Sequence, residues 1–392
     1  MISQATPWLP DLPATWERAQ IRRVAGIRNG ADYREVEVAE GGYPVYGSGG
    51  EFRRAGKYLF AGESVLFGRK GTIDKPLHVT GRFWTVDTMF YTDLNREKVV
   101  PRYLYYYATT MPFGLYATST ALPSVTGAQL AGHTMPLPPL EVQKVIADYL
   151  DRETARIDTL IEEQQRLIEI LRERRQAAVD EAFAQLGRER VPLRRFITFL
   201  TSGSRGWGSY YADEGDRFLR IGNLPRANLL IRGDVQFVDL PPGVTEGSRT
   251  VLHEGDLLFS ITAYLGSVAV VDEEWEGAYV SQHVALCRLD LSRVDPRFIG
   301  WFMLTTGGQD QLNEGAAGGT KMQLALDDVR CLSVPVVPID QQERIAASIE
   351  DRTERIDKLI AETERFIELS QERRAALIAA AVTGQIDVRE VA

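Results

Sequence analysis

The sequence predicts an α+β protein built as a pseudo-twofold internal repeat. Two α/β domains are expected, joined by two long helices that form an antiparallel coiled coil. Residues 139–183 and 338–382 match without a gap at an offset of 199, with 19 identities in 45 positions. Both stretches carry apolar residues at spacings of three and four, the pattern of coiled-coil helices. A repeat of this length implies two similar halves, each ending in a long helix.

The repeat divides the chain of 392 residues into four parts: a first domain over residues 1–139, a first long helix over 140–187, a second domain over 188–338 and a second long helix over 339–392. Asp340 followed by Glu343 fits a capping box, so we expect Asp340 to be the N-cap of the second helix. The helices are expected to pair with each other. A homodimeric coiled coil and two core helices of a single globular domain are the alternatives.

Composition excludes several classes of protein. The chain is 44% hydrophobic and 25% charged, as in globular proteins. It has no apolar run long enough to span a membrane and no signal-peptide pattern at residue 1, so we expect a cytoplasmic protein with no membrane contact. Cys287 and Cys331 are the only cysteines, which excludes a disulfide framework. The four histidines lack the spacing of metal ligands, so no metal site is expected.

Charge alone does not predict nucleic-acid binding. The formal net charge is −9, with a balance of +3 over residues 1–147 and −6 over residues 189–346. DNA binding would therefore need local basic patches or a basic partner.

Each half follows the same order of expected elements. Short apolar runs predict strands, for example at Val65–Phe67 and Leu257–Phe259. A helix with a tyrosine face is expected over residues 101–116, and we expect its tyrosines to pack in a core. Residues 26–99 and 201–292 hardly match between the halves. One scaffold with two different inserts suggests two related surfaces that bind two different targets.

The sequence resembles the specificity subunits of type I restriction–modification systems over nearly its whole length. Two duplicated Arg-Ile-Asp helices contribute to this resemblance. The other motifs that carry it are Tyr43-Pro44-Val45-Tyr46-Gly47-Ser48-Gly49-Gly50, Gly68-Arg69-Lys70-Gly71-Thr72-Ile73, Pro139-Leu140-Glu141-Val142-Gln143 and Pro338-Ile339-Asp340-Gln341-Gln342.

The resemblance implies a non-catalytic subunit with two target recognition domains. Each domain would bind one half of a split sequence in double-stranded DNA, and the helices would set the gap between the halves. The resemblance implies two adenine-N6 methyltransferase subunits as partners, which carry S-adenosylmethionine and dock on the helices. Two restriction/translocase subunits with ATP and Mg would join where the system has a nuclease. No cofactor is expected in this chain itself.

Candidate DNA-binding residues are polar, cationic or aromatic side chains in expected loops, because such side chains contact base edges and phosphates. In the first domain they are Ser48, Arg53, Arg54, Lys57, Arg69, Lys70 and Lys75. In the second domain they are Arg205, Trp207, Tyr210, Arg220, Asn223, Arg226, Asn228, Tyr264, Gln282, His283 and Lys321. The strongest candidate is the loop 68–72, where two adjacent cations lie between glycines.

Two other functions are compatible with the sequence. A coiled-coil scaffold or protein-interaction adaptor that does not bind DNA would explain the acidic balance. A fused restriction–methylation enzyme would need a catalytic domain, for which the chain has neither the motifs nor a free segment. The expected function is therefore DNA specificity, with the scaffold as the alternative.

Overall fold

The structure is a computed structural model of the chain, and it describes residues 8–116, 122–241, 243, 246–315 and 323–391. Over these ranges, no helix is long and apolar enough to cross a membrane. The candidate Lys321 lies outside the described residues.

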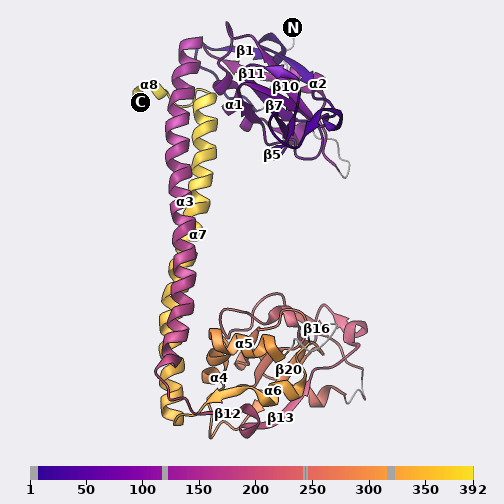
Figure 1. Ribbon diagram of the computed structural model, residues 1–392, viewed down its shortest axis with the longest axis vertical. Helices are drawn as coiled ribbons and strands as arrows, with labels where there is room; N and C mark the ends of the chain where they lie inside the picture. Colours follow the sequence, from indigo (N-terminus) through magenta and orange to yellow (C-terminus); the bar gives the residue numbers. More distant parts are fainter. Residues whose placement is uncertain (1–7, 117–121, 242, 244–245, 316–322, 392) are drawn as a thin grey trace. The chain divides into compact units, whose positions relative to one another are not determined.

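Contacts divide the chain into two compact units, and each unit joins one domain to parts of both long helices (Figure 1). Unit 1 consists of Met1–Gln165 and Arg365–Ala392, and unit 2 consists of Arg166–Glu364. The C-terminal segment thus belongs to the unit of the first domain.

A four-stranded antiparallel sheet forms the centre of unit 1. Its order is β2-β10-β7-β8, and its strands are Ala25–Asn29 (β2), Met89–Leu94 (β10), Ser64–Gly68 (β7) and Leu77–Val79 (β8). Every residue of β7 is buried, as expected from the apolar run Val65–Phe67. Helices from the same domain pack on this sheet, α1 on β7 and β8, and α2 on β2.

Unit 2 contains the same sheet in the order β13-β20-β17-β18. Its strands are Ile197–Ser202 (β13), Val284–Leu289 (β20), Leu257–Ser260 (β17) and Val268–Val270 (β18). The two inserts that hardly match in sequence therefore share a strand order. A buried strand requires apolar side chains but no particular ones, so a shared fold can persist without detectable identity.

Each domain has a further sheet, and these two sheets differ. Unit 1 has the order β3-β5-β4-β9-β6, with strands Glu37–Val38, Gly50–Ala55, Tyr43–Gly47, Arg82–Thr85 and Phe60–Ala61. Unit 2 has the order β14-β16-β15-β19, with strands Tyr211–Ala212, Gln236–Val238, Asp216–Leu219 and Tyr279–Val280. One parallel pair occurs in each, β4 with β9 and β15 with β19.

A two-stranded sheet precedes each long helix. In unit 1 it pairs Glu17–Gln20 (β1) with Thr134–Leu137 (β11), and in unit 2 it pairs Arg190–Pro192 (β12) with Ser333–Pro335 (β21). The helices are Pro101–Thr109 (α1), Gly127–Gly132 (α2), Leu140–Ala184 (α3), Pro296–Met303 (α4), Thr306–Gly315 (α5), Leu326–Cys331 (α6), Ile339–Val382 (α7) and Val388–Val391 (α8).

Helix α1 is shorter than the helix expected over residues 101–116. It ends at Thr109, and Pro112, which has no backbone N–H to donate, follows shortly after. Tyr103, Tyr106 and Tyr107 are buried, so the expectation that these tyrosines pack in a core is confirmed.

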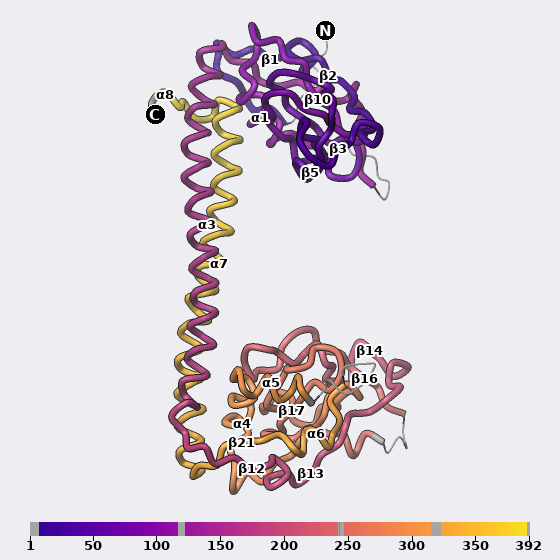
Figure 2. Tube along the Cα trace, in the orientation of Figure 1, coloured from indigo at the N-terminus to yellow at the C-terminus, as the bar shows by residue number. Residues whose placement is uncertain are grey.

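The long helices α3 and α7 lie side by side (Figures 1 and 2). In unit 2, Arg172 of α3 contacts Glu364 of α7, and Glu181 of α3 contacts Arg352 of α7. Residue numbers rise along one helix as they fall along the other, so the pair is antiparallel. In each unit, buried positions of α3 are spaced by three and four residues, as in a heptad seam: Leu150, Thr154 and Ile157 in unit 1, and Ile168, Leu171, Arg175 and Ala178 in unit 2.

A buried glutamine fastens the start of each long helix to its domain. The amide oxygen of Gln143 accepts from Val100 N at 2.8 Å, and its Nε2 donates to Lys98 O at 3.0 Å. Gln342 does the same in unit 2, where its amide oxygen accepts from Asp295 N at 3.0 Å. The glutamine shared by the two sequence motifs is therefore a structural clamp.

Asp340 is not the N-cap of α7, so this expectation was wrong. The helix begins one residue earlier, at Ile339. The Asp340 carboxylate instead accepts from Arg344 Nη2 at 2.8 Å, one turn along the helix. Pro338, with φ fixed by its ring, already starts the first turn and supplies a carbonyl to Gln342 N.

The end of a long helix completes each domain core. In unit 1, the Tyr103 hydroxyl contacts Val382 O of α7 at 3.1 Å and Pro136 O at 3.0 Å. In unit 2, Phe183 near the end of α3 packs on Phe298 of α4, with ring centroids 5.2 Å apart. Each domain is therefore closed by the helix that follows the other domain in sequence.

Candidate nucleic-acid interface

In unit 1, the loop after β7 presents two exposed cations at the end of the central sheet. Arg69 N donates to Thr88 O at 2.8 Å, and Arg69 O accepts from Val125 N at 3.0 Å. The Arg69 guanidinium lies 5.9 Å from the Phe90 ring centroid, and Lys70 is exposed. Both cations line a surface hollow of about 500 Å³ that also includes Asn29. The backbone of the loop is thus fixed, while its charges face solvent.

Glycine is required at the start of this loop. A Cβ on Gly68 would lie 2.0 Å from Thr72 O, and Gly71 has φ of +85°. Both positions allow the loop to fold back tightly on itself. The two-glycine pattern seen in the sequence therefore has a structural cause.

Strand β5 and the segment after it form a second group of cations. Arg53 pairs with Glu37 at 3.2 Å and Arg54 pairs with Glu51 at 3.0 Å, with all four side chains substantially exposed. Exposed ion pairs contribute at most about 1 kcal/mol, so a phosphate can replace the carboxylates. Lys57 is also exposed, and Ser48 is half-buried in the turn between β4 and β5.

Among the described residues, Lys57, Lys70 and Lys75 form no ion pair. All three are exposed. Free ammonium groups on one domain provide the positive charge that the net charge of the chain conceals, and such groups contact phosphates.

In unit 2, polar side chains gather where β17 ends and β20 begins. His283 Nδ1 lies 3.0 Å from Thr262 Oγ1, and His283 Nε2 lies 3.1 Å from the Gln282 amide nitrogen. Gln282 N donates to Ser204 O at 3.0 Å, which brings the exposed Arg205 to the same edge. Since β17 corresponds to β7 in sheet order, this surface is the counterpart of the loop after β7.

Tyr264 and Arg226 lie at this edge as well. The Arg226 guanidinium is 5.8 Å from the Tyr264 ring centroid. Both residues line a hollow of about 380 Å³ with Thr262, Gln309 and Asn313. The candidates Arg205, Arg226, Tyr264, Gln282 and His283 are therefore brought together on one domain.

Two sequence candidates are buried and do not belong to this surface. Trp207 is 3% exposed and stacks on Phe218, with ring centroids 5.6 Å apart. Asn223 is also 3% exposed; its Nδ2 donates to Arg232 O at 2.9 Å and its Oδ1 accepts from Arg220 N at 2.9 Å. The sequence predicts both as DNA-binding because they are an aromatic and a polar side chain in expected loops, but here these side chains hold the domain together.

Three further candidates are partly committed to the fold. Tyr210 is half-buried with its ring against Trp207. Asn228 Oδ1 accepts from Leu230 N at 3.1 Å within its own turn. Arg220 is half-buried. These three residues are weaker candidates than Arg226 or Tyr264.

Sequence reasoning missed Asn29 and Thr262, which line the two hollows beside predicted residues. Neither residue is charged, and the pair Asn29-Gly30 by itself predicts only a turn, so no local signal marked either residue as part of a binding surface. Alignment of the two four-stranded sheets would have found both, because each side chain follows or ends a central strand.

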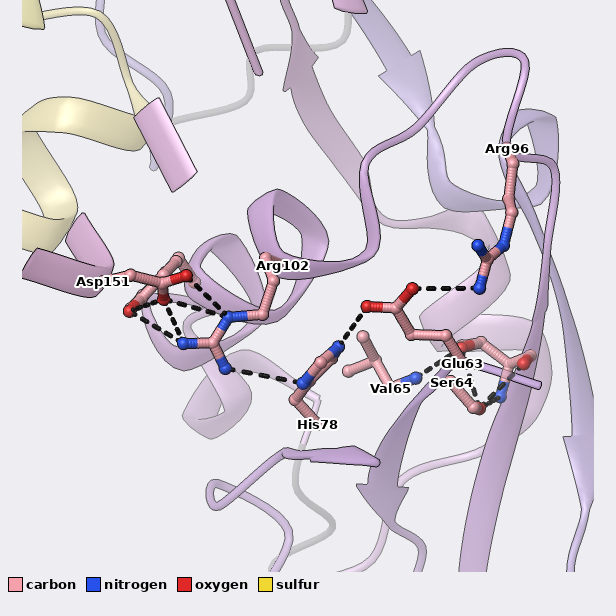
Figure 3. Close-up of polar contacts among 9 residues, drawn as sticks. Glu63, Ser64, Val65, His78, Arg96, Arg102 and Asp151 are labelled. Atoms are coloured by element: carbon pink, nitrogen blue, oxygen red, sulfur yellow. Dashed lines mark hydrogen bonds and ion pairs between the residues drawn. The ribbon is translucent and has the colours of Figure 1, made fainter. Parts of the chain in front are cut away.

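A polar network fixes the first domain on α3 (Figure 3). Arg102 of α1 donates from Nε to Asp151 Oδ1 of α3 at 2.9 Å, and Arg102 Nη1 approaches His78 Nδ1 at 3.4 Å. His78 Nε2 lies 2.7 Å from Glu63, which also accepts from Arg96 at 2.9 Å. The network extends from α3 through α1 and β8 to the residue before β7.

Burial lowers the pKa of His78, with a smaller opposing effect from its hydrogen bond to Glu63. A neutral ring then accepts from Arg102 at Nδ1 and donates to Glu63 from Nε2, which satisfies both nitrogens. The network supports the strand that leads into the loop containing Arg69.

Comparison with known families accounts for this arrangement. The sequence model of the type I restriction modification DNA specificity domain matches residues 13–172 and 243–368, which is more than half of the chain. The chain belongs to the type I restriction–modification DNA specificity family. The fold class expected from the internal repeat, two α/β domains with two long helices, is thereby confirmed.

Curated members of this specificity family match over most of the chain. The EcoBI type I restriction enzyme specificity subunit of Escherichia coli is 21% identical over 432 residues, covering 98% of this chain and 89% of that protein. A putative type I restriction enzyme specificity subunit of Haemophilus influenzae is 25% identical over 359 residues, covering 85% and 86% respectively.

Solved structures show the same fold. One chain comes from a study of complex assembly and conformational transition of the type I R-M system. It has a TM-score of 0.77 at 17% identity and covers 96% of this chain and 100% of its own. The HsdS subunit from Thermoanaerobacter tengcongensis has a TM-score of 0.56 at 17% identity, with coverage of 96% and 99%. At this identity the likeness concerns the fold of the specificity family, not its targets.

Proposed function

We propose that this type I specificity subunit recognises a split DNA sequence, with one half bound by each domain. The observation that carries the proposal is the duplicated central sheet, β2-β10-β7-β8 and β13-β20-β17-β18. Equivalent connections, after β7 and after β17, carry the candidate DNA-binding side chains in both units. One scaffold thus presents two surfaces of related geometry.

The two surfaces differ in chemistry, so the two half-sequences are expected to differ. Unit 1 presents Arg69 and Lys70 after β7, whereas unit 2 presents Thr262 and Tyr264 after β17. Cations contact phosphates and guanine edges, whereas hydroxyls and rings contact other base edges and methyl groups. The target would therefore be asymmetric, and α3 and α7 would set its gap.

The helices offer equivalent apolar surfaces for two methyltransferase subunits. Phe366 and Leu369 in unit 1 stand at the repeat positions of Leu167 and Ile170 in unit 2, and all four are 39–52% exposed. Each pair is spaced three residues apart, so its members share a helix face outside the heptad seam. Two equivalent faces suit two copies of one partner, each of which would pack an amphipathic helix against one face.

Docking can be tested by charge placed on one face at a time. Replacing Leu167 and Ile170 with glutamate should leave one methyltransferase bound, and replacing Phe366 and Leu369 should do the same. The masses of the complexes would be measured by mass photometry. Leu230→Glu, at an equally exposed leucine that is not part of α3 or α7, is the control and should retain two copies. If one double variant lost both methyltransferase copies, or if it lost neither, the docking faces would be wrongly assigned.

Catalysis is assigned to the partners. The subunit would contribute no reactive group of its own; S-adenosylmethionine would be held by the methyltransferase subunits. ATP and Mg would be held by two restriction/translocase subunits where the system includes a nuclease. Methyl transfer to DNA by the purified subunit alone would contradict this division.

The deciding experiment is a methylome. The subunit is expressed with its neighbouring methyltransferase in a host that lacks adenine methylation, and N6-methyladenine is mapped by single-molecule sequencing. The expected result is a split motif with a fixed gap and a methylated adenine in each half. Absence of both methylation and complex formation would favour the alternative, a coiled-coil scaffold that does not bind DNA.

A further inference from the structure

Tyr264 has an unusual backbone for a residue with a large side chain. Its φ is +61°, and among the described residues it is the one non-glycine with positive φ. It lies in the connection between β17 and β18. In unit 1 the equivalent connection, between β7 and β8, places its positive φ at Gly71, the residue type that adopts it without strain.

Hydrogen bonds hold this conformation in place. The Tyr264 carbonyl oxygen accepts from Ser260 Oγ at 2.7 Å and from Ser267 N at 3.3 Å. Gln309 of α5 supports the same connection, since its Nε2 donates to Gly266 O at 2.9 Å. A fully buried serine and a helix thus fix the loop in a strained state.

The strain does not serve to bury the ring. Tyr264 is 61% exposed, and its one close charged neighbour in the described structure is Arg226. Within the described part of the chain, Arg226 forms no ion pair, so its charge is available to a phosphate. Strained backbone that presents an exposed side chain is typical of binding sites.

Polar side chains lie next to the ring. Thr262, two residues earlier, contacts His283, which in turn contacts Gln282. These hydroxyl, imidazole and amide groups are donors and acceptors of the kind that contact base edges. The ring therefore lies within a surface suited to base contact, not on a separate face.

We propose that Tyr264 is a specificity-determining residue of the second domain. Its ring contacts a base pair of one half-sequence, and Arg226, which lies beside the ring, contacts a phosphate. Aromatic and apolar side chains contact thymine methyl groups and base steps in this way, whereas arginine neutralises phosphates of the DNA backbone. This inference rests on the proposed function and names a residue for it.

The test uses the subunit with its methyltransferase, and compares methylomes of Tyr264→Ala, Tyr264→Gly and Tyr264→Phe. Alanine and glycine should relax one or two adjacent positions in one half-sequence, with the other half and the gap unchanged. Phenylalanine should keep the motif, because it keeps the ring. Glycine also removes the backbone strain at residue 264. A loss of sequence specificity in Tyr264→Gly can therefore not be attributed to misfolding.

Tyr211→Ala is the matched control, because Tyr211 is an exposed tyrosine on another sheet of the same unit. The motif should be unchanged in this variant. An unchanged motif in both Tyr264→Ala and Tyr264→Gly would overturn the assignment, as would the same relaxation in Tyr211→Ala. In either of these cases, a split motif in the wild-type methylome would still support the proposed function. If the wild type showed no split motif, the proposed function itself would be wrong.

Arg226→Gln tests the second part of the proposal. The variant should weaken binding of the complex to all DNA sequences alike, and should reduce the slope of log affinity against log salt concentration by about one. Fluorescence anisotropy at several salt concentrations measures both. An unchanged slope would exclude a phosphate contact by Arg226.

Discussion

Arg175 of α3 forms a two-point ion pair with Asp357 of α7. Its Nε lies 2.7 Å from Oδ1 and its Nη2 lies 3.1 Å from Oδ2. The repeat places the same pair in unit 1, where Arg374 contacts Asp158 at 2.8 and 3.2 Å. An ion pair within a mostly apolar seam favours one register and one orientation of the helices, because a shifted register would leave the charges unpaired.

Loss of Asp357 should cost more than loss of its repeat counterpart. The Arg175 side chain is 9% exposed, whereas Arg374 is 31% exposed. Asp357→Ala leaves a buried charge without a partner, which should lower the free energy of unfolding by about 3 kcal/mol. Asp158→Ala leaves a charge that water can reach, and should cost about 1 kcal/mol. Urea unfolding of both variants measures the difference, and equal losses would contradict this reasoning.

The double variant Arg175→Leu with Asp357→Ala separates stability from register. Removing both charges should restore most of the stability lost in Asp357→Ala, since no buried charge is left unpaired. The same chain should populate alternative oligomers if the pair specifies orientation. Size-exclusion chromatography with light scattering would detect such oligomers. An unaltered oligomeric state would show that the Arg175–Asp357 pair does not determine the register of the helices.

Gly68 tests the loop that presents Arg69 and Lys70. A Cβ there would lie 2.0 Å from Thr72 O, a backbone atom that cannot move without opening the loop. Gly68→Ala should therefore cost about 1–3 kcal/mol in unfolding free energy and reduce recognition of one half-sequence. The effect is measured by the methylation rates of the complex on DNA with the full recognition sequence and on DNA in which one half-sequence is mutated.

Gly49→Ala is the control for this change. No atom lies within 4 Å of a Cβ built there, and its φ is not positive. The variant should match the wild type in stability and methylation. Equal effects of both substitutions would mean that the loop does not depend on the close approach at Gly68.

The long helices were predictable, whereas the site was predictable only in part. The heptad pattern is a property of the sequence itself, so α3 and α7 follow directly from periodicity. The ion-pair partner of Asp357 could not be predicted in the same way, because Arg175 lies far away in sequence and only the antiparallel pairing brings the two residues together. The same holds for the two central sheets, whose order is conserved between units with hardly any identity.

Within the loops, residue type did not distinguish surface from core. Trp207 and Tyr264 are both aromatic residues in a glycine-containing segment, yet one is 3% and the other 61% exposed. Burial depends on strands from elsewhere, here the sheet around Phe218. Asn223 shows the same limitation, because the carbonyls that bind its amide come from a segment about ten residues later.

His133 should make the stability of the chain depend on pH. Burial lowers the pKa of His133 to about 4, and tyrosine hydroxyls contact both ring nitrogens, Tyr107 at 2.7 Å and Tyr116 at 2.5 Å. The unfolded histidine has a pKa near 6.5, so below that pH the unfolded chain binds a proton that the folded chain binds only near pH 4. This residue's contribution to stability is therefore complete above pH 6.5 and falls by up to about 3 kcal/mol as the pH decreases towards 4.

The variant His133→Gln isolates this effect from other titrating groups. It should be less stable than the wild type above pH 6.5, because the packing against Trp8 and the tyrosines is lost. The difference should shrink as the pH falls, because only the wild type pays the protonation cost. Urea unfolding at a series of pH values measures the difference, and a constant difference would contradict the role of His133.

Helix length should set the gap of the recognised sequence. Inserting seven residues at equivalent repeat positions, after Gln165 and after Glu364, keeps the heptad seam in phase. Seven residues lengthen each helix by about 10 Å, the rise of about three base pairs of duplex DNA. The methylome of this variant should show a gap longer by about three base pairs, with both half-sequences unchanged.

An insertion of two residues at the same positions is the control. Two residues rotate the following side chains by about 200° around the helix axis, so the apolar stripes of α3 and α7 no longer face each other. Methylation should be lost with this variant, although it adds less length. A lengthened gap with intact methylation after the out-of-phase insertion would show that length alone matters. An altered half-sequence after the heptad insertion would show that domains and helices are not separable parts.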